Sequence, residues 1–191
     1  MMRVIAGTAR GKNLTSLPGE DVTRPTINRV KEAMFSSVQF LVPGARVLDL
    51  FAGSGQLGIE ALSRGAARCV FLDTSREAVG VILANCKTAG VFSKSRVIPD
   101  DAFHFLATTR EQFDLALLDP PFHYGTVAKA LPLLSGHMAP GGVVLCETEL
   151  TADLPGTVQG LVQVRQYKYG KILVARYEKE EQLWMLRNCL I

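Results

Sequence analysis

The sequence predicts an open α/β fold: a mostly parallel sheet with an antiparallel C-terminal hairpin, preceded by an N-terminal hairpin and helix. From residue 46 onward, short apolar runs alternate with segments of helical periodicity, which is typical of a parallel sheet covered on both faces. After residue 160 that rhythm ends, and two strand-like runs flank Gly170. The chain has 191 residues, of which 48% are hydrophobic, so it can bury one full core. We therefore expect one body of catalytic size.

The first 45 residues predict a small extension that docks on this body. Residues 2–5 and 12–17 could pair as strands across the turn at 7–11. Thr26 could then cap a helix, because apolar side chains recur after it at steps of three or four residues. This apolar stripe consists of Ile27, Val30, Met34, Val38 and Leu41.

The body is predicted to contain five strands and four helices before its hairpin. We expect the strands at 46–50, 68–73, 95–98, 115–118 and 142–147 and the helices at 57–64, 76–89, 102–108 and 126–134. Ser75 can cap the second helix, and Gly65 and Gly90 stand where C-terminal caps are expected. The hairpin strands are expected at 161–169 and 171–177. The predicted division is an extension at 1–45, a body at 46–177 and a tail at 178–191, with the tail a short amphipathic helix.

Composition narrows the class of protein. No stretch approaches the ~18 uninterrupted apolar residues of a membrane helix, and residues 1–7 lack the apolar region of a secretory signal. We therefore expect a soluble, cytoplasmic protein. The four cysteines, Cys69, Cys86, Cys146 and Cys189, match no zinc spacing, so we expect them to be reduced and structural and expect no metal.

Positive charge is concentrated near the N-terminus. Residues 1–46 carry seven basic and three acidic side chains, a net of +4, whereas the other residues carry fourteen and fifteen, a net of −1. A basic extension on a near-neutral body indicates that a polyanion binds there, although an ordinary solvated surface would also fit.

A glycine-rich turn follows the first strand of the expected sheet. Residues 47–58 read VLDLFAGSGQLG and complete the pattern G-x-G-x-x-G with Gly53, Gly55 and Gly58. Asp73 ends the next strand twenty residues after Gly53, where a carboxylate can accept hydrogen bonds from both ribose hydroxyls. These features predict a nucleotide-type cofactor, and a dinucleotide-binding oxidoreductase fits them equally well.

Asp49 favours S-adenosylmethionine instead. A carboxylate ahead of the glycine turn would lie against a pyrophosphate, whereas it could hold the ammonium of a methionine moiety. Asp101, after the third strand, could accept a hydrogen bond from an adenine amine or could cap the following helix. Asp49, Asp73, Asp101 and Asp119 end four different strands, and ligands of open α/β sheets bind at those ends.

The segment DPPF at 119–122 follows the apolar run at 115–118 and predicts a site that methylates an amine. Its two prolines fix two φ angles and remove two N–H donors, so the carbonyls are held without local donors that compete for them. Asp119 and the Pro120 carbonyl could then grip one NH2 group, and Phe122 offers a face on which a base could stack. Pro-Pro turns are common, so the segment alone does not decide between this site and an ordinary loop.

With DLFAGSG at 49–55 and DPPF at 119–122, the chain resembles a class I S-adenosylmethionine-dependent methyltransferase, with a Rossmann-like sheet, that acts on an exocyclic amine. Four N-terminal segments narrow this resemblance to one family of methyltransferases: RVIAG from residue 3, RG from residue 10, TRPT from residue 23 and RVKEAMF from residue 29. They look like those of the bacterial 16S ribosomal RNA guanine-N2 methyltransferases of the RsmD type.

The resemblance implies a set of site residues. Those near the cofactor would be Asp49, Phe51, Ala52, Gly53, Ser54, Gly55, Gly58, Asp73, Asp101 and Ala102. The catalytic loop would be Asp119, Pro120, Pro121 and Phe122. The basic residues expected to contact RNA are Arg3, Arg10, Lys12, Arg24, Arg29 and Lys31.

The implied reaction transfers a methyl group from S-adenosylmethionine to N2 of a guanosine in 16S ribosomal RNA, by resemblance at position 966. We expect a monomer that acts away from membranes on 16S RNA; a partly assembled small subunit is the expected substrate, and the sequence leaves naked RNA open as the alternative. A DNA adenine-N6 or cytosine-N4 methyltransferase could use the same loop, as could a protein-glutamine methyltransferase. An NAD-dependent oxidoreductase and a non-catalytic RNA-binding assembly factor are alternatives of other classes.

Overall fold

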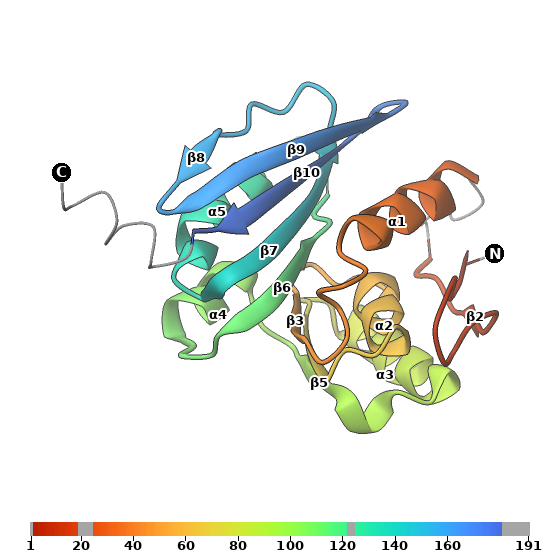
Figure 1. Cartoon of the computed structure of the whole chain (residues 1–191). Helices are drawn as coiled ribbons and strands as arrows, with labels where there is room; N and C mark the ends of the chain where they lie inside the picture. Colours follow the sequence, from red (N-terminus) through yellow and green to blue (C-terminus); the bar gives the residue numbers. More distant parts are fainter. Residues whose placement is uncertain (1, 19–24, 122–124, 181–191) are drawn as a thin grey trace, which may run out of the picture.

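The computed structural model describes residues 2–18, 25–121 and 125–180 (Figure 1). Its centre is an eight-stranded sheet in the order β5-β4-β3-β6-β7-β10-β9-β8. The strands are β3 (Arg46–Asp49), β4 (Arg68–Leu72), β5 (Ser95–Ile98), β6 (Phe113–Leu118), β7 (Met138–Glu149), β8 (Thr157–Val158), β9 (Leu161–Tyr169) and β10 (Ile172–Lys179). Strands β3 to β7 pair in parallel, and β10, β9 and β8 are added antiparallel. The predicted parallel sheet with an antiparallel edge is confirmed.

Helices cover both faces of the sheet. They are α1 (Pro25–Ser37), α2 (Gln56–Ser63), α3 (Arg76–Ala89), η1 (Phe92–Lys94), α4 (Ala102–Thr108) and α5 (Thr126–Ser135). Apolar side chains of α1, α2 and α3 share one buried cluster with alternate residues of β3, β6 and β7, among them Val47, Leu115 and Leu145. The other residues of these strands pack with α4 and α5 in a second cluster. Alternation along each strand therefore fills two cores, one on each face.

Most predicted bounds agree with the structure to within two residues, and three differences have physical causes. α1 begins at Pro25, so Thr26 lies inside the helix and the expectation that it caps the helix is wrong; proline is favoured at the first helical position. β7 is longer than expected because β6 and β10 pair with it on its two sides. β10 runs to Lys179, so Glu178 and Lys179 belong to the sheet. The rest of the predicted tail helix, from 181, lies outside the described residues.

The N-terminal extension packs into the same core as the body. β1 (Met2–Arg3) and β2 (Asn13–Leu14) form the predicted small hairpin. The Glu60 carboxylate on α2 is fully buried, and it accepts hydrogen bonds from the backbone N–H of Ile5 at 2.8 Å and of Ala6 at 3.0 Å. A buried carboxylate needs such partners, so these bonds fix where the extension lies. Among the described residues, no helix combines the length and apolarity needed to cross a membrane.

Candidate active site

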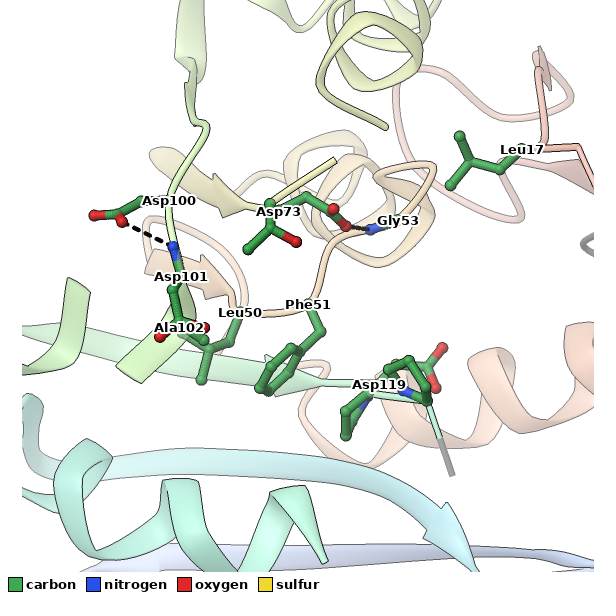
Figure 2. A pocket seen from close by; sticks show the side chains of 12 residues that line it. Leu17, Leu50, Phe51, Gly53, Asp73, Asp100, Asp101, Ala102 and Asp119 are labelled. Atoms are coloured by element: carbon green, nitrogen blue, oxygen red, sulfur yellow. Dashed lines mark hydrogen bonds between the residues drawn. The ribbon is translucent and has the colours of Figure 1, made fainter. Parts of the chain in front are cut away.

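A pocket of about 580 Å³ opens where β3, β4, β5 and β6 end. Each of these strands contributes the residues that follow it, and the N-terminal extension contributes Leu17 (Figure 2). The lining consists of Leu17, Leu50, Phe51, Gly53, Asp73, Thr74, Asp100, Asp101, Ala102, Asp119, Pro120 and Pro121. Ligands of open α/β sheets bind at these strand ends, and the volume lies in the range of small-molecule sites.

Asp73 is joined to the glycine turn. Its Oδ2 accepts the N–H of Gly53 at 2.9 Å (Figure 2), and its Oδ1 accepts the N–H of Ser75 at 2.9 Å. Gly53 and Gly55 have φ values of 53° and 78°, which glycine adopts without strain. Each carboxylate oxygen can accept more than one hydrogen bond, so Asp73 retains acceptor capacity toward the pocket that it lines.

Asp49 lies beneath this turn and is only 1% exposed. Its Oδ2 accepts the N–H of Gly58 at 2.8 Å. Burial raises its pKa to about 7; the Gly58 hydrogen bond opposes that rise, and the carboxylates of Asp119 and Asp73 add to it. Asp49 and Asp119 also line a smaller pocket of about 50 Å³ beside the glycine turn. A cation placed there would relieve the electrostatic cost of this cluster.

Asp101 caps α4. Its Oδ1 accepts the N–H of Phe103 at 2.9 Å and of His104 at 3.0 Å, so the capping role that the sequence left open is realised. Asp101 and Ala102 still line the pocket, and Asp100 lies beside them. The Asp100 carboxylate accepts the Asp101 N–H at 2.8 Å (Figure 2). It also forms a hydrogen bond with the His104 ring, which lowers the pKa of Asp100.

The residues after β6 line the pocket from the side opposite the β5 end. Pro120 is buried and Pro121 is exposed, and Asp119 contributes to both pockets. Phe122, the last residue of the predicted catalytic loop, lies outside the described residues. Asp119 and Asp49 therefore border the same small space.

Glu147 is a second carboxylate near Asp119 that the sequence analysis missed. The β6–β7 register pairs Leu118 with Cys146, so Asp119 and Glu147 come next on adjacent strands. Because Leu118 and Cys146 both face the α4–α5 cluster, the alternation of side chains along a strand directs the two carboxylates to the other face. Burial and the charge of Asp119 raise the pKa of Glu147. The sequence feature that could have revealed Glu147 is its position as an acidic residue at the end of the otherwise apolar strand expected at 142–147.

The remaining residues of the glycine loop differ in what they contact. Phe51 lines both pockets, whereas Ala52 and Ser54 are buried and line only the smaller one. Gly55 is the N-cap of α2. Gly58 is buried, and a Cβ there would overlap the Phe71 ring and the Cys69 sulfur. Close packing of α2 on β4 therefore requires Gly58, which is the usual role of the third glycine of the pattern.

The predicted RNA-contacting side chains fall into two groups. Arg3, Arg10, Lys12 and Arg29 are exposed, and Arg24 lies outside the described residues. Lys31 is 1% exposed, and its Nζ donates to the Arg3 carbonyl at 2.8 Å and lies 3.4 Å from Glu60. The expectation that Lys31 contacts RNA is therefore wrong, because its ammonium is enclosed in the core. Burial lowers its pKa, and Glu60 opposes that shift.

Asn85 joins the extension to the cofactor loop and was also missed. It is 1% exposed on α3, where its amide group exchanges two hydrogen bonds of 2.8 Å with the backbone of Thr15. Its Nδ2 also donates to the Ser54 carbonyl at 2.9 Å. The available signal was a polar residue on the apolar stripe that contains Ala78, Ile82 and Cys86.

Comparison with known proteins places the chain among named relatives. The family model described as "Conserved hypothetical protein 95" matches residues 2–178. The Escherichia coli protein named "Ribosomal RNA small subunit methyltransferase D" is 32% identical over 183 residues, covering 95% of this chain and 91% of that protein. The Bacillus subtilis protein YlbH is 38% identical over 183 residues, covering 93% and 99%. The solved structure of Escherichia coli yhhF has a TM-score of 0.82 at 31% identity, covering 95% and 99%.

Proposed function

The chain belongs to the family described as "Conserved hypothetical protein 95", and we propose that it methylates N2 of a guanosine in 16S ribosomal RNA with S-adenosylmethionine as methyl donor. One observation carries the proposal: Asp119 and the strand-end residues of the glycine-loop site line a single pocket. The name of the Escherichia coli relative supports ribosomal RNA of the small subunit as the substrate. By resemblance the acceptor is the guanosine at position 966, within a partly assembled subunit.

The residues of the pocket fit S-adenosylmethionine. Asp73 retains acceptor capacity for ribose hydroxyls, and Ala102 and Leu50 offer apolar surface for an adenine ring. Asp49 is a buried carboxylate without a cation among its described hydrogen-bond partners, so it suits the ammonium of the methionine moiety. When bound, S-adenosylmethionine supplies an electrophilic methyl group on a sulfonium. A pyrophosphate would instead meet the charges of Asp49 and Asp119, which argues against a dinucleotide cofactor.

The chain's own contribution to catalysis is to position the amine. The N2 lone pair of guanine is delocalised into the ring, so the site must direct that lone pair toward the methyl group. In the proposed mechanism, Asp119 and the Pro120 carbonyl accept hydrogen bonds from the two N–H groups and Phe122 stacks on the base, and the proton that N2 loses on methylation passes to Asp119 or to solvent. The guanosine must leave its stack to reach the pocket, as in other base-modifying enzymes. The exposed side chains of Arg3, Arg10, Lys12 and Arg29 would hold the RNA phosphates.

The direct test of this role is Asp119→Ala, compared with Asp153→Ala, which removes an exposed carboxylate far along the chain. We expect Asp119→Ala to lower the single-turnover rate on 16S RNA by roughly a hundredfold or more, because one positioned acceptor is lost, and to leave the affinity for S-adenosylhomocysteine within about threefold. Asp153→Ala should match the wild type in both measurements. A near-normal rate for Asp119→Ala would contradict the mechanism.

The substrate is tested in cells. Ribosomal RNA from a deletion strain should lack one N2-methylguanosine, and the wild-type gene should restore it whereas the Asp119→Ala gene should not. Asp119→Asn keeps one oxygen that can accept a hydrogen bond, so it should retain more activity than Asp119→Ala if orientation of the amine is the main contribution. An unchanged nucleoside profile in the deletion strain would refute the proposed substrate.

A further inference from the structure

The β9–β10 hairpin carries a positive charge that the near-neutral total for residues 47–191 conceals. Residues 161–179, which form its two strands and turn, contain Arg165, Lys168, Lys171, Arg176 and Lys179 and one acidic residue, Glu178. These 19 residues thus carry a net charge of +4, equal to that of the whole N-terminal segment. Whereas β1 and β2 pair over only two residues each, β9 and β10 form an antiparallel pair that includes eight paired residues of β10.

The tip of this hairpin lies at the same edge of the sheet as the active site. The last residue of β6, Leu118, pairs with Cys146 of β7. Ile172, at the start of β10, pairs with Glu149, which lies three residues further along β7. At about 3.3 Å per residue, the tip projects roughly 10 Å beyond the end of β6. Figure 1 shows the tip and the start of α1 at this same side of the molecule. RNA whose base enters the pocket would pass this tip.

Three basic side chains of the hairpin are available to a ligand. Arg165, Lys168 and Lys171 are exposed, and within the described residues none of the three forms an ion pair with a carboxylate. By contrast, Arg46 and Arg64, elsewhere on the body, are held by Asp114 and Glu60. The hairpin charges are therefore left for an external anion.

Two arginines stand directly opposite each other on the face of the hairpin that α1 shares. Arg165 pairs in the register with Arg176, and like charges in such a position are destabilising. Arg176 is tied to α1, because it donates to the Ser37 carbonyl at 2.7 Å, and one of its nitrogens lies 2.6 Å from Glu178. Arg165 has no such partner among the described residues. A phosphate beside Arg165 would relieve this repulsion.

We propose that the β9–β10 hairpin is a second RNA-binding surface, in which Arg165 on the face shared with α1, Lys171 at the tip and Lys168 on the opposite face hold phosphates of substrate RNA that passes around the tip beside the flipped guanosine. This proposal rests on the proposed function, because it takes RNA to be the polyanion that the site binds. The N-terminal segment and the hairpin bind the strand from two sides of the pocket mouth. Backbone contacts of this kind set the register of the RNA without reading its sequence.

The test compares two triple variants of equal charge change. Arg165→Gln, Lys168→Gln and Lys171→Gln together remove the hairpin charges, whereas Lys87→Gln, Lys94→Gln and Arg110→Gln remove three exposed charges where strands β5 and β6 begin. Binding of an unmodified 16S RNA transcript is titrated at several KCl concentrations. Each lost phosphate contact should lower the slope of log K against log salt by about 0.7 to 0.9.

We expect the hairpin variant to lose about two units of that slope and the control variant less than about half a unit. Both should bind S-adenosylhomocysteine with wild-type affinity, which shows that they are folded. Equal slopes for the two variants would overturn the proposal. Normal binding of the transcript together with lost methylation of assembled subunits would also overturn it, in favour of a ribosomal protein on this surface. If the wild type neither binds nor methylates 16S RNA, whether as a transcript or within a partly assembled small subunit, it is the proposed function that fails.

Discussion

Burial of Asp49 should make the affinity for the cofactor depend on pH. Its pKa is raised to about 7, chiefly by burial, and the carboxylates of Asp119 and Asp73 face it. An ammonium ligand requires the ionised carboxylate. With this pKa, Asp49 is about 10% ionised near pH 6 and about 90% ionised near pH 8. We therefore expect S-adenosylhomocysteine to bind about tenfold more tightly near pH 8 than near pH 6, a difference of about 1.4 kcal/mol.

Calorimetry with two ligands identifies the group that titrates. S-adenosylhomocysteine carries the amino acid moiety, whereas 5′-methylthioadenosine has the same adenosine and thioether without an ammonium. The first should show the tenfold change and the second should bind equally at both pH values. In Asp49→Asn, the affinity for S-adenosylhomocysteine should stay low at both pH values. A pH-independent affinity in the wild type, or an equal change for both ligands, would refute the assignment of the ammonium to Asp49.

The same pKa also affects the stability of the free protein. The folded-state value lies above the ordinary value of 3.8, so the folded protein holds the proton more tightly than the unfolded chain does. The corresponding stability is present below about pH 4 and is lost as the pH rises toward about 7, by about 4 kcal/mol at most. The melting temperature of the ligand-free wild type should therefore fall across this range more than that of Asp49→Asn. An identical pH dependence in the two proteins would contradict this prediction.

Three substitutions test the packing around the site by urea denaturation. Asn85→Ala leaves three backbone groups without their hydrogen-bond partner, so it should lower the free energy of unfolding by about 2 to 3 kcal/mol and weaken S-adenosylhomocysteine binding. A decrease below about 0.5 kcal/mol would contradict the structural role of these hydrogen bonds. Glu60→Gln leaves the Lys31 ammonium buried without its counter-charge and should cost about 3 to 5 kcal/mol, much of it recovered when Lys31→Met is added. Gly58→Ala should cost about 1 to 3 kcal/mol because its Cβ meets a ring. Gly80→Ala is the control, because a Cβ at this position of α3 has no atom within 4 Å beyond its chain neighbours and the backbone of its own helix, and it should stabilise the protein by about 0.5 to 1 kcal/mol. Equal effects of the two glycine substitutions on stability would exclude the packing argument.

Local signals explain what the sequence could predict. The bounds of α3 agree with the prediction because Ser75 and Gly90 mark its two ends, and both act as caps in the structure. Parallel strands end at a common edge, so carboxylates after four such strands were expected to share a site, and Asp73, Asp101 and Asp119 do line one pocket. These inferences need only the chain's own periodicity and turn chemistry.

Burial of polar side chains could not be predicted in the same way, because it depends on contacts between residues far apart in the sequence. Lys31 falls beside the apolar stripe of α1, where an exposed position is the usual outcome, yet Glu60 and the Arg3 carbonyl enclose it. The position of Glu147 became evident only from the register of β7 against β6. In each case the partner that stabilises the group comes from another element.

If the extension binds RNA as proposed, the contacts of Asn85 predict that RNA binding and cofactor binding are linked through one short piece of backbone. Asn85 holds Thr15 and the Ser54 carbonyl together, and Leu17, two residues further on, lines the cofactor pocket. Arg10 and Lys12, which we expect to contact phosphates, precede this wall of the pocket by only a few residues. The net charge of the chain therefore changes near residue 45, but the residues on the two sides of that point pack in one shared core. RNA that moved the extension would also move Leu17 and strain the bonds to the glycine loop, so bound RNA and bound cofactor should change each other's affinity by the same factor.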